Sequence, residues 1–370
     1  MNKKILVFIG GSYVSGLEVV TLHLIKELAD DGYDVRCVIS GWNDGNFKRK
    51  LNDIGVQYHE VKLGSIYLRK PVWTIDTLLH YPQAYFSLKK MIKDFDPDVF
   101  HFCNFAMPLM LYPLISYRSV YNLQETHLPG IKHKLIYKLL NKKIRYFTAV
   151  SKHIVRVLEN LGIPSDKIKL IYNGIPPVVA GSIAEAVQQP ILIFAIIGQV
   201  VEWKGHDTLL TAVELLVKKG IVNFRVQIFG NDQTAYGKAL KEKTTQQELN
   251  DYFEWKGFVN DQDKVYRDCC VVIVPSLSGE PCSLTIIEAM SRGKAVIVSD
   301  RGGNPELVQH EQTGLVFKAE EAQALSDCML MLLQQRTLIN ELAVKAHQRA
   351  INNYTSDRMA ENYIALYESL

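Results

Sequence analysis

The chain has 370 residues, of which 48% are hydrophobic and 22% are charged, and its formal net charge is +3. This length exceeds what one hydrophobic core usually organises, so two domains are expected, and the composition is typical of a soluble globular protein. No apolar run approaches the length of a membrane-spanning helix.

The first residues and the cysteines indicate the compartment. Residues 5–9 form a short apolar run after a basic pair. The run is too short for a signal peptide and no cleavage-type segment follows, so we interpret it as a β-strand. The six cysteines are scattered and form no Cys-x-x-Cys pair. They indicate free thiols in a reducing cytoplasm rather than disulfides or a zinc site.

Residues 1–175 alternate apolar strand patterns with helical patterns, which predicts a parallel sheet covered on both faces. The predicted strands are residues 5–9, 34–39, 56–61, 98–103, 119–123, 146–150 and 168–172. The predicted helices are residues 17–31, 72–95, 131–141 and 152–161. Ligands bind such sheets at the carboxyl ends of the strands.

The loop at residues 10–16 follows the first strand and precedes a helix. Its glycines would let the backbone approach a ligand, although a tight turn explains them equally well. The spacing is not that of the Gly-x-Gly-x-x-Gly dinucleotide fingerprint.

The first half is basic, with 24 Lys and Arg against 15 Asp and Glu, whereas the remainder has 18 against 24. An anionic partner on that side and a solvated surface are both open. Residues 131–145 carry six of these basic side chains beside an apolar stripe. Two interpretations remain open for this helix: contact with an anionic membrane surface, or an apolar side facing the core and a solvated basic side.

A second series of strands and helices follows a linker at residues 176–189. Its predicted strands are residues 191–197, 225–229, 253–255, 271–274 and 295–298, with a short strand within 312–317. Its predicted helices are residues 207–219, 236–249 and 261–268, with a further helical pattern in the second part of residues 276–290, and the chain is helical from residue 319. The domains are therefore predicted at residues 1–175 and 190–353. Residues 354–370 form a last helix with apolar residues suited to docking.

Residues 276–290 contain the most informative junction, because a strand ends there in a loop that leads into a helix. A helix start presents unpaired N–H groups and a positive dipole end, which suits phosphate. Two carboxylates, Glu280 and Glu288, flank the junction. They would repel phosphate but would accept hydrogen bonds from hydroxyl groups, so a nucleotide sugar is the ligand that suits both features.

Two other loops follow strands of the second half. Lys204 lies in the first and could place an ammonium group on a phosphate, with Gly205 allowing a helix to start close by. Gly302 and Gly303 lie in the second, where they could admit a ligand or serve a tight turn.

These motifs together resemble the family 4 retaining glycosyltransferases of the GT-B type (glycosyltransferases group 1). The resemblance covers nearly the whole chain and is carried by residues 198–206, 275–290, 293–308 and 314–315, and by 16–18, 32–35, 98–102, 149–151 and 172–175. The pair Glu280 and Glu288 is its most specific sign. The resemblance implies two doubly wound Rossmann-like α/β domains that face each other across a cleft, with residues 354–370 crossing back to the first domain.

The resemblance also implies roles for single residues. Glu280 would bind hydroxyls of the donor sugar, Glu288 those of the ribose, and Lys204 the diphosphate. The positions implied for donor binding are Gly16, Gln199, Lys204, Glu280, Cys282, Ser283, Leu284, Thr285 and Glu288. No cofactor and no metal ion are expected, because side-chain cations and the helix dipole can neutralise the leaving diphosphate.

Three positions depart from the family pattern. Gln199 stands where Arg is frequent, and Cys282-Ser283 stands where Phe-Gly is common. A histidine usually follows the fifth strand, but Gln124 occupies that position here and the nearest histidine is His127.

The acceptor side is therefore less well defined than the donor side. We assign it to Gly11, Gln124 and His127, and we count Glu125 and His127 with Glu280 and Lys204 as candidate catalytic residues. A retaining transfer can also proceed without an enzymatic base, because the leaving phosphate can take the acceptor proton.

The leading functional hypothesis is sugar transfer from a nucleotide sugar, with UDP-sugars favoured, to a hydroxyl of a saccharide or lipid-linked saccharide in surface polysaccharide or glycoconjugate synthesis. The alternatives are a UDP-sugar epimerase of GT-B shape and a non-catalytic protein that binds nucleotide sugars. No nucleic-acid partner is expected. The expected location is the cytoplasm, with peripheral contact at the inner face of the plasma membrane through residues 131–145 left open.

Overall fold

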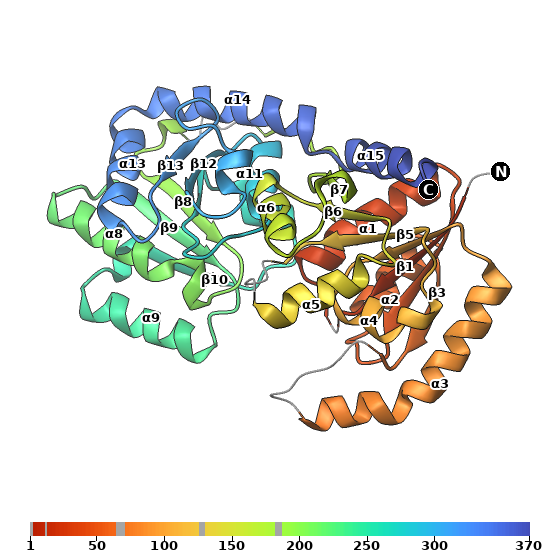
Figure 1. Cartoon of the computed structure of the whole chain (residues 1–370). Helices are drawn as coiled ribbons and strands as arrows, with labels where there is room; N and C mark the ends of the chain where they lie inside the picture. The colour runs from red at the N-terminus through yellow and green to blue at the C-terminus, as the bar shows by residue number, and fades with distance from the viewer. Residues whose placement is uncertain (1–2, 12, 64–70, 126–129, 182–186) are drawn as a thin grey trace. The chain divides into compact units, whose positions relative to one another are not determined.

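The computed structural model describes residues 3–11, 13–63, 71–125, 130–181 and 187–370 (Figure 1). The chain forms two compact units. Unit 1 comprises Met1–Pro176 together with Ser356–Leu370, and unit 2 comprises Pro177–Thr355. The unit borders thus fall next to the domain borders expected at residues 175 and 354. The last helix belongs to the first unit.

Unit 1 is built on a seven-stranded sheet in the order β3-β2-β1-β4-β5-β6-β7. All of its neighbouring strands pair in parallel, and β1 lies centrally with Ile5 beside both Val35 and Val99. The strands are β1 (Lys4–Ile9), β2 (Asp34–Ser40), β3 (Gln57–Val61), β4 (Val99–Phe102), β5 (Ser119–Leu123), β6 (Tyr146–Ala149) and β7 (Ile168–Leu170). The residues of β1, β4 and β5 are almost entirely buried, as expected for parallel strands in a sheet that is covered on both faces.

The helices of unit 1 are α1 (Gly16–Asp30), α2 (Asn46–Asp53), α3 (Pro71–Phe95), α4 (Ala106–Met110), α5 (Ile131–Leu140), α6 (Lys152–Asn160) and α15 (Ser356–Glu368), with 3₁₀ turns η1 (Tyr112–Leu114) and η2 (Ser165–Lys167). Helices α2 and α4 were not predicted from the sequence. Helix α2 is strongly polar and buries only Phe47 and Leu51, so its periodic signal is weak.

Unit 2 is built on a six-stranded parallel sheet in the order β10-β9-β8-β11-β12-β13. Its strands are β8 (Leu192–Ile197), β9 (Phe224–Phe229), β10 (Phe253–Gly257), β11 (Val271–Val274), β12 (Ala295–Ser299) and β13 (Leu315–Phe317). Its helices are α8 (His206–Lys218), α9 (Ala235–Gln246), α10 (Gln262–Arg267), α11 (Leu284–Ser291), α12 (Asn304–Leu307), α13 (Ala322–Gln334) and α14 (Arg336–Asn353), with 3₁₀ turns η3 (Glu202–Lys204) and η4 (Asn250–Tyr252). The predicted pair of doubly wound α/β sheets is confirmed.

The segment predicted as a linker is only partly described. Arg336 of α14 donates hydrogen bonds to the carbonyl oxygens of Val187, Gln189 and Pro190, which fixes the end of this segment onto unit 2. Within the described ranges, no helix combines the length and the apolar character needed to cross a bilayer.

The basic segment at residues 131–145 is helical only as far as Leu140. Tyr137 and Leu140 are buried, whereas Leu135 and Leu139 are exposed. The apolar stripe is therefore divided. One side packs into unit 1, and the other faces solvent beside the lysines.

Helix α15 is bound to unit 1 by buried polar contacts as well as by apolar packing. The Tyr367 hydroxyl lies 2.6 Å from His101 Nδ1, and the Tyr363 hydroxyl lies 3.1 Å from Thr148 Oγ1. At its start, Ser356 donates its N–H to the carbonyl oxygen of Ile175, at 2.8 Å. Burial lowers the pKa of His101 to about 3, so this imidazole is neutral at physiological pH.

We expect Tyr367→Phe to lower the free energy of unfolding by about 1–3 kcal/mol, because it leaves a buried ring nitrogen of His101 without its hydroxyl partner. Urea unfolding followed by circular dichroism would measure the change. Tyr117→Phe is the matched control, because the Tyr117 hydroxyl bonds Arg145 at the surface and its loss should cost less than about 0.5 kcal/mol. Equal effects of the two variants would contradict this account of α15.

Candidate functional site

The junction predicted to bind an anion is present in unit 2. Strand β11 ends at Val274, an irregular loop follows, and α11 begins at Leu284 with Ser283 as its N-cap. The first N–H groups of a helix have no partner inside the helix. The loop thus directs the start of α11 toward the carboxyl edge of the sheet, where β8 also ends.

Lys204 and Glu280 form a buried ion pair at this edge. Lys204 Nζ lies 2.5 Å from Glu280 Oε1, and the side chains are 17% and 6% exposed. Ser276 donates its hydroxyl to the same carboxylate oxygen, at 2.5 Å. Two residues that the sequence assigned to different parts of the donor, its diphosphate and its sugar, therefore contact each other directly.

The environment of Glu280 keeps this carboxyl group ionised. Burial alone would favour the neutral acid, but the Lys204 charge and hydrogen bonds from Lys204 and two serines outweigh it. The pKa of Glu280 therefore lies below its usual value. The pair presents a fixed carboxylate and a fixed ammonium group at one position.

Two glycines allow the loops around this pair to approach each other. Gly205 has a φ of +77°, and a Cβ there would lie 1.9 Å from the carbonyl oxygen of Pro275. Gly302 has a φ of +60°, and its Cβ would lie 2.2 Å from the carbonyl oxygen of Glu280. Gly302 therefore lies in a turn that packs closely against the backbone of Glu280, a contact that the sequence did not indicate.

Further backbone hydrogen bonds hold these loops together. Leu277 donates its N–H to the carbonyl oxygen of Trp203 at 2.8 Å, and Gly303 donates to that of Glu280 at 2.8 Å. The turn that carries Lys204 and the loop that carries Glu280 are thus joined through main-chain atoms, which fixes the distance between their side chains.

Glu288 lies one turn further along α11. It accepts a hydrogen bond of 2.8 Å from the hydroxyl of buried Tyr266. Burial raises the pKa of Glu288, and the Tyr266 hydroxyl and the Arg292 charge only partly oppose this. Arg292 also stacks over the Tyr266 ring, 4.8 Å from its centroid. One carboxylate oxygen of Glu288 is therefore fixed by Tyr266.

The remaining donor residues of unit 2 have different surroundings. Cys282 and Ser283 are buried in the loop, whereas Leu284 and Thr285 are half-buried at the start of α11. The Thr285 hydroxyl lies 3.4 Å from the carbonyl oxygen of Ile197, which joins α11 to the end of β8. Gln199 is exposed after β8, so its amide is accessible to a ligand.

In unit 1, the loop after β1 contains Gly11 and Gly16. A Cβ on Gly11 would lie 2.0 Å from Glu18 Oε1, so this glycine is required by the buried Glu18 side chain. Glu18 accepts from the N–H and the hydroxyl of Ser15, which completes a capping box for α1. Gly16 is the first residue of that helix.

Gln124 follows β5 and is held by a residue that the sequence did not single out. Asn173 Nδ2 lies 3.4 Å from Gln124 Oε1, and among the described residues Gln124 Nε2 has no hydrogen-bond partner although it is buried. Partial desolvation raises the pKa of the neighbouring Glu125. His127 lies outside the described residues.

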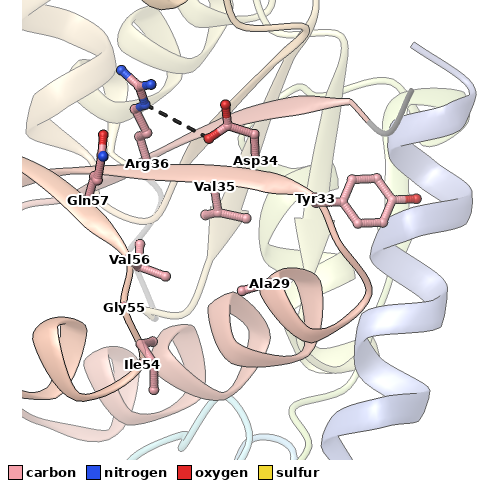
Figure 2. A pocket seen from close by; sticks show the side chains of 9 residues that line it. All are labelled: Ala29, Tyr33, Asp34, Val35, Arg36, Ile54, Gly55, Val56 and Gln57. Atoms are coloured by element: carbon pink, nitrogen blue, oxygen red, sulfur yellow. Dashed lines mark ion pairs between the residues drawn. The ribbon is translucent and has the colours of Figure 1, made fainter.

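A depression of about 360 Å³ lies at the amino ends of β2 and β3, between Asp34 and Gln57 (Figure 2). Arg36 and Asp34 form an ion pair of 3.9 Å beside it. The described site residues of unit 1 (Gly11, Gly16, Gln124 and Glu125) follow the carboxyl ends of β1 and β5, so this depression is separate from them. Within the part of the chain that is described, no three His, Cys, Asp or Glu side chains are placed to hold a metal ion.

Sequence reasoning missed several residues that position the site, among them Ser276, Tyr266, Asn173 and Glu18. Glu18 could have been found, because Ser15-x-x-Glu18 is a capping-box pattern. Tyr266 and Asn173 act on segments distant in sequence, and Ser276 lies only four residues before the carboxylate that it bonds, but no pattern in the sequence gives any of the three a role.

Two family models match the chain. The model described as Glycosyltransferase Family 4 matches residues 14–178, and the model described as Glycosyl transferases group 1 matches residues 183–353. The two matches correspond to the two sheets.

Curated relatives are about one-quarter identical to the chain over the aligned residues. An N,N'-diacetylbacillosaminyl-diphospho-undecaprenol alpha-1,3-N-acetylgalactosaminyltransferase of Campylobacter jejuni is 25% identical over 373 residues, 93% of each protein. The amylovoran biosynthesis glycosyltransferase AmsK of Erwinia amylovora is 28% identical over 214 residues, 55% of this chain and 51% of that protein. An uncharacterized glycosyltransferase of Methanocaldococcus jannaschii is 25% identical over 55% of each protein. The match with these last two spans about half of their length.

Solved structures share the fold. Anabaena HepE in complex with UDP and glucose superposes with a TM-score of 0.82 at 19% identity over 100% of both chains. Sucrose-phosphate synthase from Thermosynechococcus elongatus gives a TM-score of 0.80 at 17% identity over 99% of both chains. Together with the matched family models, these likenesses show that the chain belongs to the family 4 glycosyltransferases of the GT-B type.

Proposed function

We propose that the protein is a retaining glycosyltransferase that moves a sugar from a nucleotide sugar, preferably a UDP-sugar, to a hydroxyl group of a saccharide or lipid-linked saccharide. The observation that carries the proposal is the buried pair of Lys204 and Glu280 beside the start of α11. A carboxylate, an ammonium group and free helix N–H groups at one sheet edge suit a ligand with hydroxyls on one side and a diphosphate on the other.

In the proposed reaction, the bond between the anomeric carbon and the diphosphate oxygen breaks, and a bond to the acceptor oxygen forms on the same face of the sugar. The acceptor proton passes to the leaving phosphate oxygen. Lys204 and the start of α11 stabilise the negative charge that grows on the diphosphate, so the reaction needs no metal ion. Glu280 orients the sugar through its hydroxyls, and Glu288 binds the ribose.

In this proposal the residues of unit 1 bind the acceptor. Gly11 lies in the loop after β1, and Gly16 is the first residue of α1. We assign Gly11 to the acceptor and Gly16 to the donor phosphates, as the family resemblance implies. Asn173 donates a hydrogen bond to the amide oxygen of Gln124, so the amide N–H groups of Gln124 are available to donate to the acceptor. Burial raises the pKa of Glu125, so this carboxyl group keeps its proton up to a higher pH than an exposed glutamate does. His127 stays a candidate of the same group.

The names of the relatives support a role in the synthesis of surface polysaccharides or glycoconjugates. The Campylobacter relative is named for a diphospho-undecaprenol substrate, and the Erwinia relative for amylovoran. A lipid-linked acceptor would be met at the cytoplasmic face of the membrane, and α5 with its exposed lysines suits peripheral contact with anionic lipid.

Incubation with a panel of UDP-, GDP- and ADP-sugars tests the proposal. We expect release of UDP that depends on a saccharide acceptor, with the anomeric configuration retained in the product by NMR and activity unchanged by EDTA. Isomerisation of the donor without an acceptor would instead support the epimerase. Binding without turnover would indicate a non-catalytic protein.

We expect Glu280→Gln and Lys204→Met each to lower kcat by about 10²–10³-fold, because each removes a charged group from the proposed reacting centre. Glu321→Gln is the matched control. Glu321 pairs with Lys318 at the surface of the same unit, and its loss should leave kcat unchanged. Thermal unfolding identifies a variant that has lost its fold. Full activity of a folded Glu280→Gln protein would refute the assignment.

The pH dependence of donor binding should report Glu288. Its pKa is raised in the folded protein, so the carboxylate becomes protonated at a pH above the ordinary 4.5 as the solution is acidified. Protonation removes an acceptor for the ribose hydroxyls, and the dissociation constant for UDP should therefore rise on acidification. Calorimetric titration would measure this, and Glu288→Gln should weaken binding and remove that part of the pH dependence. An unchanged profile in the variant would contradict ribose recognition by Glu288.

A further inference from the structure

Helix α3 carries large apolar side chains on the side that faces solvent. Val72 is 73% exposed, Ile75 56%, Leu79 74% and Phe86 66%. Their spacing of three, four and seven residues places them along one stripe of the helix. Scattered exposed apolar residues are ordinary, but a stripe along four turns of one helix indicates a surface that is covered in function. Figure 1 shows α3, in orange, at the periphery of unit 1.

The opposite side of α3 is attached to unit 1 by polar contacts and a few buried side chains. Trp42 Nε1 donates to Asp76 at 2.8 Å, and the Tyr81 hydroxyl donates to the carbonyl oxygen of Met110 at 2.8 Å. Ala84 and Leu88 are buried on this side. The helix is therefore docked along one face, and its apolar stripe belongs to the other.

The charged residues of α3 indicate what kind of surface the stripe contacts. Over residues 71–88, Asp76 is the only charged residue of the sequence, and its carboxylate bonds Trp42 and lies 3.1 Å from His80. The next turns contain Lys89, Lys90 and Lys93, together with one acid, Asp94. The stripe itself thus carries no carboxylate, and the segment that follows it has a net positive charge.

Helix α5 repeats this combination in the same unit. Ile131 and Leu135 are 82% and 63% exposed, and Lys132, Lys134 and Lys138 are exposed beside them. Apolar stripes flanked by lysines suit the boundary between acyl chains and anionic headgroups. A symmetric contact with a second copy of the chain would bring like-charged lysine clusters together, which is unfavourable.

We propose that the outward stripe of α3 inserts into an anionic lipid bilayer surface and is the main apolar anchor of this protein. The proposal adds to the membrane contact given above for α5, and it rests on the surface of α3 rather than on the transferase reaction. In this arrangement the α5 lysines attract the protein to the anionic surface, and the α3 side chains enter the boundary between headgroups and acyl chains.

Flotation of the full-length protein with mixed phosphatidylcholine and phosphatidylglycerol vesicles tests this. The variant is Leu79→Ser with Phe86→Ser. The matched control is Phe258→Ser with Val344→Ser, two exposed apolar residues of unit 2. We expect the partition coefficient of the α3 variant to fall about 30-fold or more, because two large side chains no longer insert. The control should float like the wild type.

The salt dependence of vesicle binding distinguishes the contribution of α3 from that of α5. Wild-type binding should persist in part at high salt, the α3 variant should lose its residual binding there, and Lys134→Gln with Lys138→Gln should lose mainly the salt-sensitive part. UDP release with a water-soluble acceptor should be the same in the α3 variant and the wild type. Because this assay contains no lipid, a failure of the proposed transferase activity would be distinguished from a failure of lipid binding.

Three results would overturn the proposal. The first is an α3 variant that does not differ from its control in flotation, and the second is a wild-type protein that does not bind vesicles at low salt. The third is a wild-type dimer by light scattering that the α3 variant converts to a monomer without any change in flotation, which would show that a second copy covers the stripe. Circular dichroism of each variant verifies that the helices remain folded.

Discussion

The contact between Lys204 and Glu280 is the interaction on which the donor half of the site depends. Both side chains are largely buried, and removing one member of a buried ion pair typically costs about 3–5 kcal/mol because the other charge is left unpaired. The surrounding loops supply what such a pair needs, namely a serine hydroxyl on the carboxylate and main-chain bonds that fix the distance. The pair is therefore preorganised before any ligand binds, which is the condition under which fixed charges stabilise a transition state well.

Glycine makes this arrangement possible at two places. Gly205 lies against Pro275 and Gly302 lies against Glu280, and both have positive φ angles. Any larger residue would push apart the loops that carry Lys204 and Glu280. These glycines serve the protein's own packing, so their effect on a ligand is indirect. Gly11 has a similar relation to the buried Glu18 in unit 1, where the glycine makes room for a helix cap.

Unit 1 is completed by a segment from the far end of the chain. Helix α15 closes it through Tyr363 and Tyr367, whose hydroxyls meet Thr148 and a neutral His101 in a buried environment. The chain thus leaves unit 1 after Pro176 and returns at Ser356. The same unit exposes the apolar stripes of α3 and α5. Unit 1 therefore combines buried polar contacts in its interior with apolar side chains that are exposed on α3 and α5.

The sequence by itself determined the two parallel sheets, the loops at their carboxyl ends and the pair of carboxylates around the start of α11. These features follow from local periodicity, from turn residues and from the spacing of residues along one helix. All three signals depend only on residues that are close in sequence. Only the tertiary structure decided that Lys204 bonds Glu280, that Tyr266 holds Glu288, and that Asn173 holds Gln124. Each of these contacts joins segments that are distant in sequence, so it depends on how strands pack side by side. The same reason applies to α5: the spacing revealed an apolar stripe, but only packing decided that Leu140 is buried while Leu135 faces solvent.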